Sequence, residues 1–87
     1  MKAEERRYVG IDLGKRDYTM AIIEKNKKMN IHHGKTSIHG RQGLYRLLER
    51  SDKVAMEAGN LAFILAREMT EQVGCDVRVD FPRFYIQ

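Results

Sequence analysis

Short apolar runs separated by polar residues divide this chain into seven expected elements. Two longer segments place apolar residues at helical spacing, over residues 40–50 and from Asn60 to Gly74. Five shorter runs have the length and composition of strands: 7–13, 17–24, 28–36, 53–57 and 76–81. Three strands followed by alternating helices and strands predict a mixed α/β sheet.

The two expected helices have recognisable ends. Ser37 or His39 is the expected N-terminal cap of the first helix, and Asn60 is the expected cap of the second. Gly74 is expected to end the second helix. The apolar residues that should face the core are Leu44, Leu47 and Leu48 in the first helix, and Leu61, Ile64, Leu65, Met69 and Val73 in the second.

The connections between strands predict the sheet order. Residues 14–16 are short enough to join the first two strands as a hairpin. Right-handed crossovers then place both helices on one face of the sheet. The most economical strand order is 3-2-1-4-5, with the third strand at an edge. In this order the first and fourth strands are neighbours.

Two acidic residues end these neighbouring strands. Asp12 closes an apolar run between Gly10 and Gly14, and Glu57 closes a second run before Gly59. Ligands gather at the carboxyl ends of parallel strands, and paired carboxylates suit the hard ion Mg²⁺. Asp12 could instead cap a turn, and Glu57 could pair with a basic side chain. Metal-dependent phosphate chemistry at Asp12 and Glu57 is the leading prediction.

Composition limits the other possibilities. The 87 residues predict one domain, and a net charge of +4 is compatible with a polyanionic partner. Lys15 and Arg16 lie beside the predicted metal edge, where they could contact a nucleic-acid backbone or form a solvated turn. Cys75 is the single cysteine, which excludes an intramolecular disulfide and suits a reducing compartment. We interpret it as a small core residue.

The sequence does not predict a membrane-spanning segment or a signal peptide. No apolar run approaches the ~18 residues that a membrane-spanning helix needs. The N-terminus lacks the apolar stretch of a signal peptide, so the cytoplasm is the default location. Residues 1–6 are expected to be a loose tail. The structure of the apolar segment 82–87 is not predicted.

Two other motifs suggest alternatives of lower specificity. The glycine-flanked acid of residues 10–14 resembles the phosphate loop of actin-like ATPases. Those proteins usually continue with small hydroxyl residues and need two large lobes, whereas this chain continues with Lys15 and Arg16. Three histidines, His32, His33 and His39, lack the spacing and the partners of a zinc site.

The motifs taken together resemble a family of mobile-element enzymes. Residues 8–15 (YVGIDLGK), 56–59 (MEAG) and 74–79 (GCDVRV), with Pro82 and Arg83, are similar to the N-terminal part of insertion-sequence DEDD transposases. These are relatives of the Piv-type invertases, with a RuvC-like catalytic domain of the RNase H fold. The resemblance implies that Asp12 and Glu57 are catalytic Mg²⁺ ligands. It also implies DNA as a partner and, for some members, a guide RNA.

The resemblance also implies that the domain is partial. The family's other two aspartates belong to a helix after the fifth strand, where this chain ends. An RNase H-like domain truncated after that strand would supply two of four carboxylates. Two-metal phosphoryl transfer needs more anionic ligands, so we expect the isolated chain to be inactive in DNA cleavage or strand transfer.

Two alternatives involve no chemistry at all. The chain could be a small nucleic-acid-binding or regulatory module whose binding weakens steeply with salt. It could also be a structural fragment that forms a homodimer, either through an exposed sheet face or through its C-terminal tail.

Overall fold

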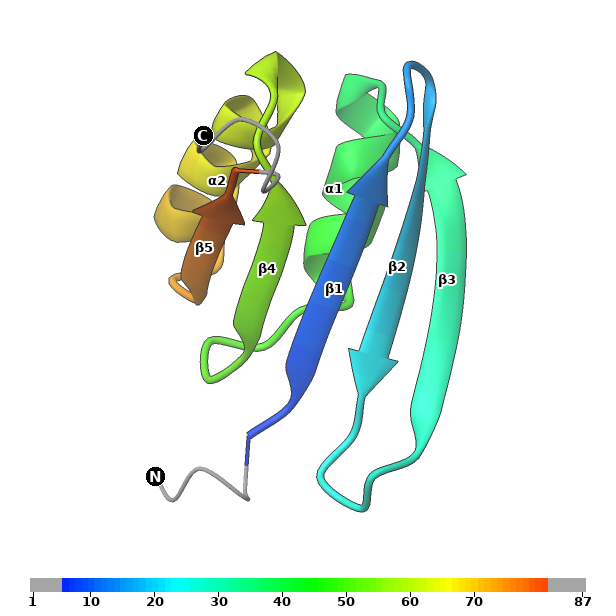
Figure 1. Cartoon of the computed structure of the whole chain (residues 1–87), viewed down its shortest axis with the longest axis vertical. Coiled ribbons are helices and arrows are strands. Elements are labelled where there is room, and N and C mark those ends of the chain that lie inside the picture. Colours follow the sequence, from blue (N-terminus) through cyan, green and yellow to red (C-terminus); the bar gives the residue numbers. More distant parts are fainter. Residues whose placement is uncertain (1–5, 82–87) are drawn as a thin grey trace.

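Two helices cover one face of a five-stranded sheet in the computed structural model, which describes residues 6–81 (Figure 1). The predicted strand order is confirmed as β3-β2-β1-β4-β5. β1 pairs antiparallel with β2 and parallel with β4. The elements in chain order are β1 (Tyr8–Leu13), β2 (Asp17–Ile23), β3 (Met29–Lys35), α1 (Ile38–Arg46), β4 (Lys53–Glu57), α2 (Asn60–Gln72) and β5 (Asp76–Asp80).

The core lies between the sheet and the helices. Alternate residues of the strands point to this side, as the period of two requires. Burying these apolar side chains supplies most of the driving force for folding. The prediction that Cys75 is a core residue is confirmed. The buried apolar residues are Val9, Ile11, Tyr18, Met20, Ile22, Leu44, Tyr45, Leu48, Val54, Met56, Ala62, Leu65, Met69 and Cys75.

The first helix is shifted from its predicted range. It begins at Ile38 because the Ser37 side chain caps it, accepting a hydrogen bond from the backbone N–H of Gly40 at 3.3 Å. It ends at Arg46, after which Leu47 donates its N–H to the carbonyl of Leu44 in a tighter turn. Leu47 lies beyond the helix and is 39% exposed, so the prediction that it faces the core is wrong.

The second helix follows its predicted range closely. Its N-cap is Gly59 rather than Asn60, and Gly74 ends it with a positive φ of 84°. Leu65 is buried as expected, but Ile64 is 49% exposed. The reason is geometric. Adjacent helical residues diverge by ~100°, so the face that buries Leu65 turns Ile64 outward.

A buried ion pair joins the start of β1 to the loop before β4. Asp52 is fully buried, and its carboxylate accepts hydrogen bonds from Arg7 Nε at 2.9 Å and Nη2 at 2.7 Å. Arg7 Nη2 also donates to the carbonyl of Leu47. The hydrogen bonds that Arg7 donates to Asp52 raise the pKa of Arg7 above its ordinary value. Glu49 and Glu24 add longer ion pairs to the Arg7 guanidinium, at 3.6 and 3.7 Å.

A second polar cluster joins the two helices. Arg41 on α1 donates two hydrogen bonds to Glu68 on α2, at 2.8 and 3.1 Å. The hydroxyl of Tyr45 donates a third to the same carboxylate at 2.6 Å. The hydrogen bonds from Arg41 lower the pKa of Glu68, while burial raises the pKa of Tyr45. The cluster therefore fixes how the helices pack on each other.

The opposite face of the sheet carries no helix within residues 6–81. Tyr8, Met29 and Ile31 are exposed apolar residues on β1 and β3. The predicted homodimer through this face stays a prediction. The predicted tails, residues 1–6 and 82–87, lie outside the described residues except for Arg6. No helix between residues 6 and 81 is long and apolar enough to cross a membrane.

Candidate functional site

Asp12 and Glu57 lie at the same edge of the sheet. The parallel register between β1 and β4 runs from Tyr8–Lys53 to Ile11–Met56, and Asp12 and Glu57 are the next residues on each strand. Both alternate with buried residues, so both point to the open face. Adjacent strands lie ~4.8 Å apart, which brings the carboxylates within reach of one ion.

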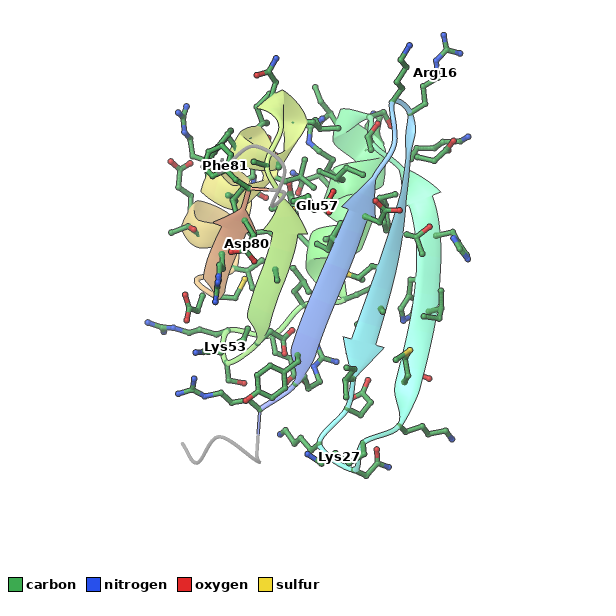
Figure 2. The ribbon with its side chains drawn as sticks, in the orientation of Figure 1. Arg16, Lys27, Lys53, Glu57, Asp80 and Phe81 are labelled. Carbon is green, nitrogen blue, oxygen red and sulfur yellow. The ribbon has the colours of Figure 1, made fainter. Side chains whose placement is uncertain are left out.

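Two hollows adjoin the carboxylates. One, of about 210 Å³, lies between the segments 11–14 and 57–62, and Asp12 and Glu57 both line it. The other, of about 330 Å³, lies on the open face beside Thr19 and is also lined by both acids. Figure 2 shows Glu57 at this end of β4. A ligand could therefore approach the two carboxylates from the end of the sheet or across its open face.

Neither carboxylate is used by the rest of the described chain. Among the ion pairs and side-chain hydrogen bonds between residues 6 and 81, none involves the side chain of Asp12 or Glu57. Both side chains belong to exposed residues. No basic residue of this region neutralises them, so their combined negative charge remains available to a cation.

A third carboxylate lies in the same row of the sheet. Asp80 on β5 is the register partner of Glu57, and it alternates with Val79. Its Oδ1 accepts a hydrogen bond from Arg78 Nε at 2.5 Å, which offsets its charge. Within residues 6–81 no three His, Cys, Asp or Glu side chains are placed together to hold a metal. Asp80 therefore lies close to the two acids but does not complete a three-ligand site.

The donor set suits Mg²⁺ and similar hard cations. Mg²⁺ binds oxygen ligands at roughly 2.0–2.1 Å in octahedral geometry and usually keeps several waters. Asp12 and Glu57 would supply two oxygen ligands, which leaves four positions for water or for oxygens of a ligand. The roles of both residues in metal binding and catalysis stay predictions.

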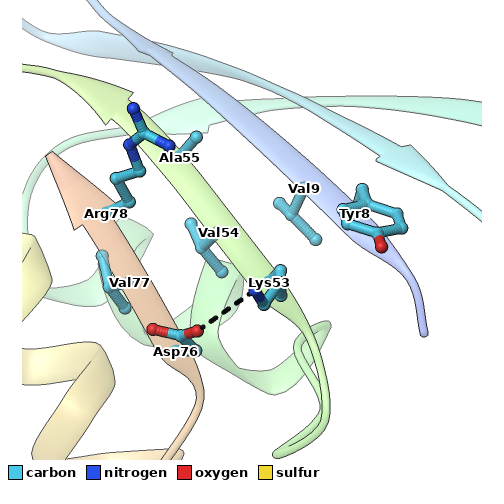
Figure 3. Close-up of a pocket in the computed structure, with 8 residues that line it drawn as sticks. All are labelled: Tyr8, Val9, Lys53, Val54, Ala55, Asp76, Val77 and Arg78. Carbon is cyan, nitrogen blue, oxygen red and sulfur yellow. Dashed lines mark ion pairs between the residues drawn. The ribbon is translucent and has the colours of Figure 1, made fainter. Parts of the chain in front are cut away.

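Another hollow in the described part of the chain lies away from this edge. It measures about 560 Å³ and lies over β1, β4 and β5 toward the starts of the strands (Figure 3). Lys53 and Asp76 in its lining form an ion pair at 3.7 Å. Its charged groups are thus partly paired. It lies far from the carboxyl ends of the strands, where ligands usually bind, and we do not assign it a ligand.

Lys15 and Arg16 form the tip of the β1–β2 hairpin. Both side chains are exposed, and Figure 2 shows Arg16 extending past the end of the sheet. The hairpin closes through a hydrogen bond from the N–H of Gly14 to the carbonyl of Asp17, at 2.8 Å. The predicted contacts of Lys15 and Arg16 with DNA or RNA stay predictions.

Comparison with known proteins finds similarity among solved structures. No family model matches the chain, and no curated protein matches it. Among solved structures, the chain is similar to the type II variant of the Aquifex aeolicus Ppx/GppA phosphatase, with 17% identity and a TM-score of 0.46. This match covers 88% of the present chain and 36% of that structure. A second structure of the Aquifex aeolicus member of the Ppx/GppA family gives 18% identity, a TM-score of 0.43, and coverages of 88% and 35%.

These findings correct the family prediction. The structural neighbours are Ppx/GppA phosphatases, so the prediction of a DEDD transposase fragment is wrong, together with its activities of DNA transposition and recombination. The structure of the chain itself confirms the mixed sheet and its strand order, whereas the RNase H-like assignment is not confirmed by these neighbours. The chain spans about a third of the length of these structures, and a likeness at this level assigns it no activity.

Proposed function

We propose that this chain binds one divalent cation, Mg²⁺, through Asp12 and Glu57, and that the cation holds a phosphate group of a ligand. The observation that carries the proposal is the placement of these two carboxylates, which form no ion pair within residues 6–81, on adjacent parallel strands. The two hollows beside them leave room for the ligand.

Charge explains why the cation must come first. Two carboxylates on one edge repel a phosphate. A bound Mg²⁺ neutralises the formal charge of Asp12 and Glu57 and offers open coordination positions to phosphate oxygens. Phosphate binding at this edge should therefore be coupled to metal binding, with each ligand strengthening the other.

The same geometry argues for binding rather than complete catalysis. Two-metal phosphoryl transfer holds two ions ~3.5–4 Å apart and needs several anionic ligands. Asp12 and Glu57 supply enough charge for one weakly bound ion. The chain by itself should bind and orient a phosphate ester without hydrolysing it at a useful rate.

Substitution of either acid should weaken cation binding. We expect Asp12→Asn and Glu57→Gln each to weaken Mg²⁺ binding by about tenfold or more, since each removes one of two charged ligands. The affinity is measured by Mg²⁺ titration of ¹⁵N-labelled protein at constant ionic strength. Asp17→Asn is the matched control, because Asp17 is exposed on β2 and pairs with Lys35 instead.

The outcomes of this titration are distinct. Shifts confined to residues near positions 12–14 and 57–60, and weakened only by the first two variants, support the proposal. If Asp17→Asn weakens Mg²⁺ binding equally, the affinity depends only on the net charge of the protein. Added phenyl phosphate should shift the resonances of residues 57–60 only when Mg²⁺ is present, which separates metal-dependent binding at this edge from a direct contact elsewhere.

A further inference from the structure

A basic hollow lies where the β1–β2 hairpin meets the junction between β3 and α1. It measures about 410 Å³ and is lined by Lys15, Arg16, Lys35, Thr36 and Ser37. The residues come from two segments that are far apart in sequence. The fold therefore builds this hollow, and the sequence pattern alone does not show it.

Hydrogen bonds hold the two segments of the hollow together. Thr36 is buried, and its N–H donates to the carbonyl of Arg16 at 2.8 Å. Its hydroxyl donates to the carbonyl of Lys15 at 3.3 Å. Arg41 Nη1 donates to the carbonyl of Thr36 at 2.8 Å from the other side. The backbone that carries the basic side chains is thus fixed before any ligand arrives.

The hollow carries an excess of positive charge. Three cationic side chains line it, and Asp17 is the one acid that contacts them within residues 6–81, through an ion pair with Lys35 at 2.7 Å. Lys15 and Arg16 form no ion pair in this part of the chain. Both members of the Lys35–Asp17 pair are highly exposed, so an anionic ligand can displace Asp17 at little cost.

We propose that this hollow is a phosphate-binding site that acts without a metal. Arg16 presents the planar fork of donors that suits phosphate oxygens, and the two lysines add point charges. Ser37 can donate its hydroxyl hydrogen while its oxygen accepts from the N–H of Gly40. The ligand is a phosphate group, carried either by a small monoester or by a phosphodiester chain.

The test uses inorganic phosphate on the full chain with a metal chelator present. Phosphate should shift the amide resonances of residues 15–16 and 35–37 in a saturable manner, beyond the effect of chloride at the same ionic strength. Arg16→Gln should weaken binding about fivefold or more through loss of a charge-assisted contact, whereas Lys28→Gln should change it less than about twofold. Lys28 is the control because it is exposed in the β2–β3 turn, outside the hollow.

A further variant and its control test the role of Asp17 at the basic hollow. Asp17→Asn releases Lys35 and should strengthen phosphate binding severalfold, whereas Glu71→Gln, which changes the net charge equally on α2, should not. Shifts that follow ionic strength alone, or equal effects of Arg16→Gln and Lys28→Gln, would overturn the proposal. Each variant is compared only after its spectrum shows the dispersion of the folded chain.

Two further ligands show which kind of molecule carries the phosphate group. Phenyl phosphate carries a dianionic monoester, and a dinucleotide without terminal phosphates carries one diester. Tighter binding of the monoester identifies a small phosphate ester as the ligand class. Tighter binding of the diester identifies a nucleic-acid backbone. If neither ligand shifts the amide resonances of residues 15–16, the proposed site is contradicted. Since no metal is present, the result is independent of the proposed cation site.

Discussion

Asp52→Ala should destabilise the protein by about 3–5 kcal/mol, because it removes the buried carboxylate that accepts two hydrogen bonds from Arg7 and leaves that guanidinium only longer ion pairs to Glu49 and Glu24. Arg7 is only 9% exposed, and the carboxylate of Asp52 accepts two of its hydrogen bonds. The substitution also removes the acceptor for the N–H of Glu49, at 2.7 Å. Small domains have total stabilities on the order of 5–15 kcal/mol, so a large fraction would be lost. Urea denaturation followed by circular dichroism measures the change.

Two comparisons isolate the cause. Asp17→Ala breaks an exposed ion pair and should cost at most about 1 kcal/mol. The double variant Arg7→Met with Asp52→Leu removes both charges and should be more stable than Asp52→Ala alone. If Asp52→Ala lowers the free energy of unfolding no more than Asp17→Ala does, the buried ion pair does not hold β1 to the loop that precedes β4.

Gly40→Ala should cost about 2–3 kcal/mol, because the new methyl group has no room and overpacking strains the fold. A Cβ at Gly40 would collide with the backbone carbonyl of Lys35, where β3 turns into α1. A backbone clash is relieved only by moving the strand or the helix. The same turn carries Thr36 and Ser37, so the variant should also weaken phosphate binding at the basic hollow.

Gly43→Ala in the same helix is the matched control. A Cβ at Gly43 meets nothing within 4 Å, and the residue is exposed in the interior of α1. Alanine is the better helix former by about 1 kcal/mol, so Gly43→Ala should stabilise the protein slightly. Thermal or chemical denaturation of both variants gives opposite signs if the contact at Gly40 is tight. The same sign for both would contradict that packing.

The pattern of the sequence predicted the fold well because strand alternation is a local property. Val54 and Met56 alternate with exposed residues on β4, and the burial pattern of the structure repeats this alternation. The strand order followed from connection lengths and the handedness of crossovers. Asp12 and Glu57 then had to reach the same edge, because their strands are neighbours in parallel register.

The parts that were missed depend on contacts between distant residues. The pairing of Arg7 with Asp52 spans 45 residues, and no local pattern indicates it. Asp80 is not among the predicted site residues, although the predicted order of the sheet already places its strand beside that of Glu57. The exposure of Leu47 follows from the end of α1 at Arg46, and helix ends are decided by capping contacts that periodicity does not show.

The family prediction was wrong for a different reason. Its motifs are short, and each has a local physical cause. Glycine at positions 10 and 14 and the acid between them suit the end of a strand near a phosphate or metal, whatever the family. Such a motif indicates a kind of chemistry at the edge of a sheet, and it does not identify the protein that carries it out.

Paramagnetic relaxation by Mn²⁺ tests most directly whether Asp12 and Glu57 hold one cation together. Substoichiometric Mn²⁺ should broaden the amide resonances of residues 12–14 and 57–60 first, and excess Mg²⁺ should restore them. Asp12→Asn and Glu57→Gln should each abolish this selectivity. Broadening centred on other exposed acids, such as Glu71 and Asp76, or a pattern unchanged in both variants, would contradict a shared cation site.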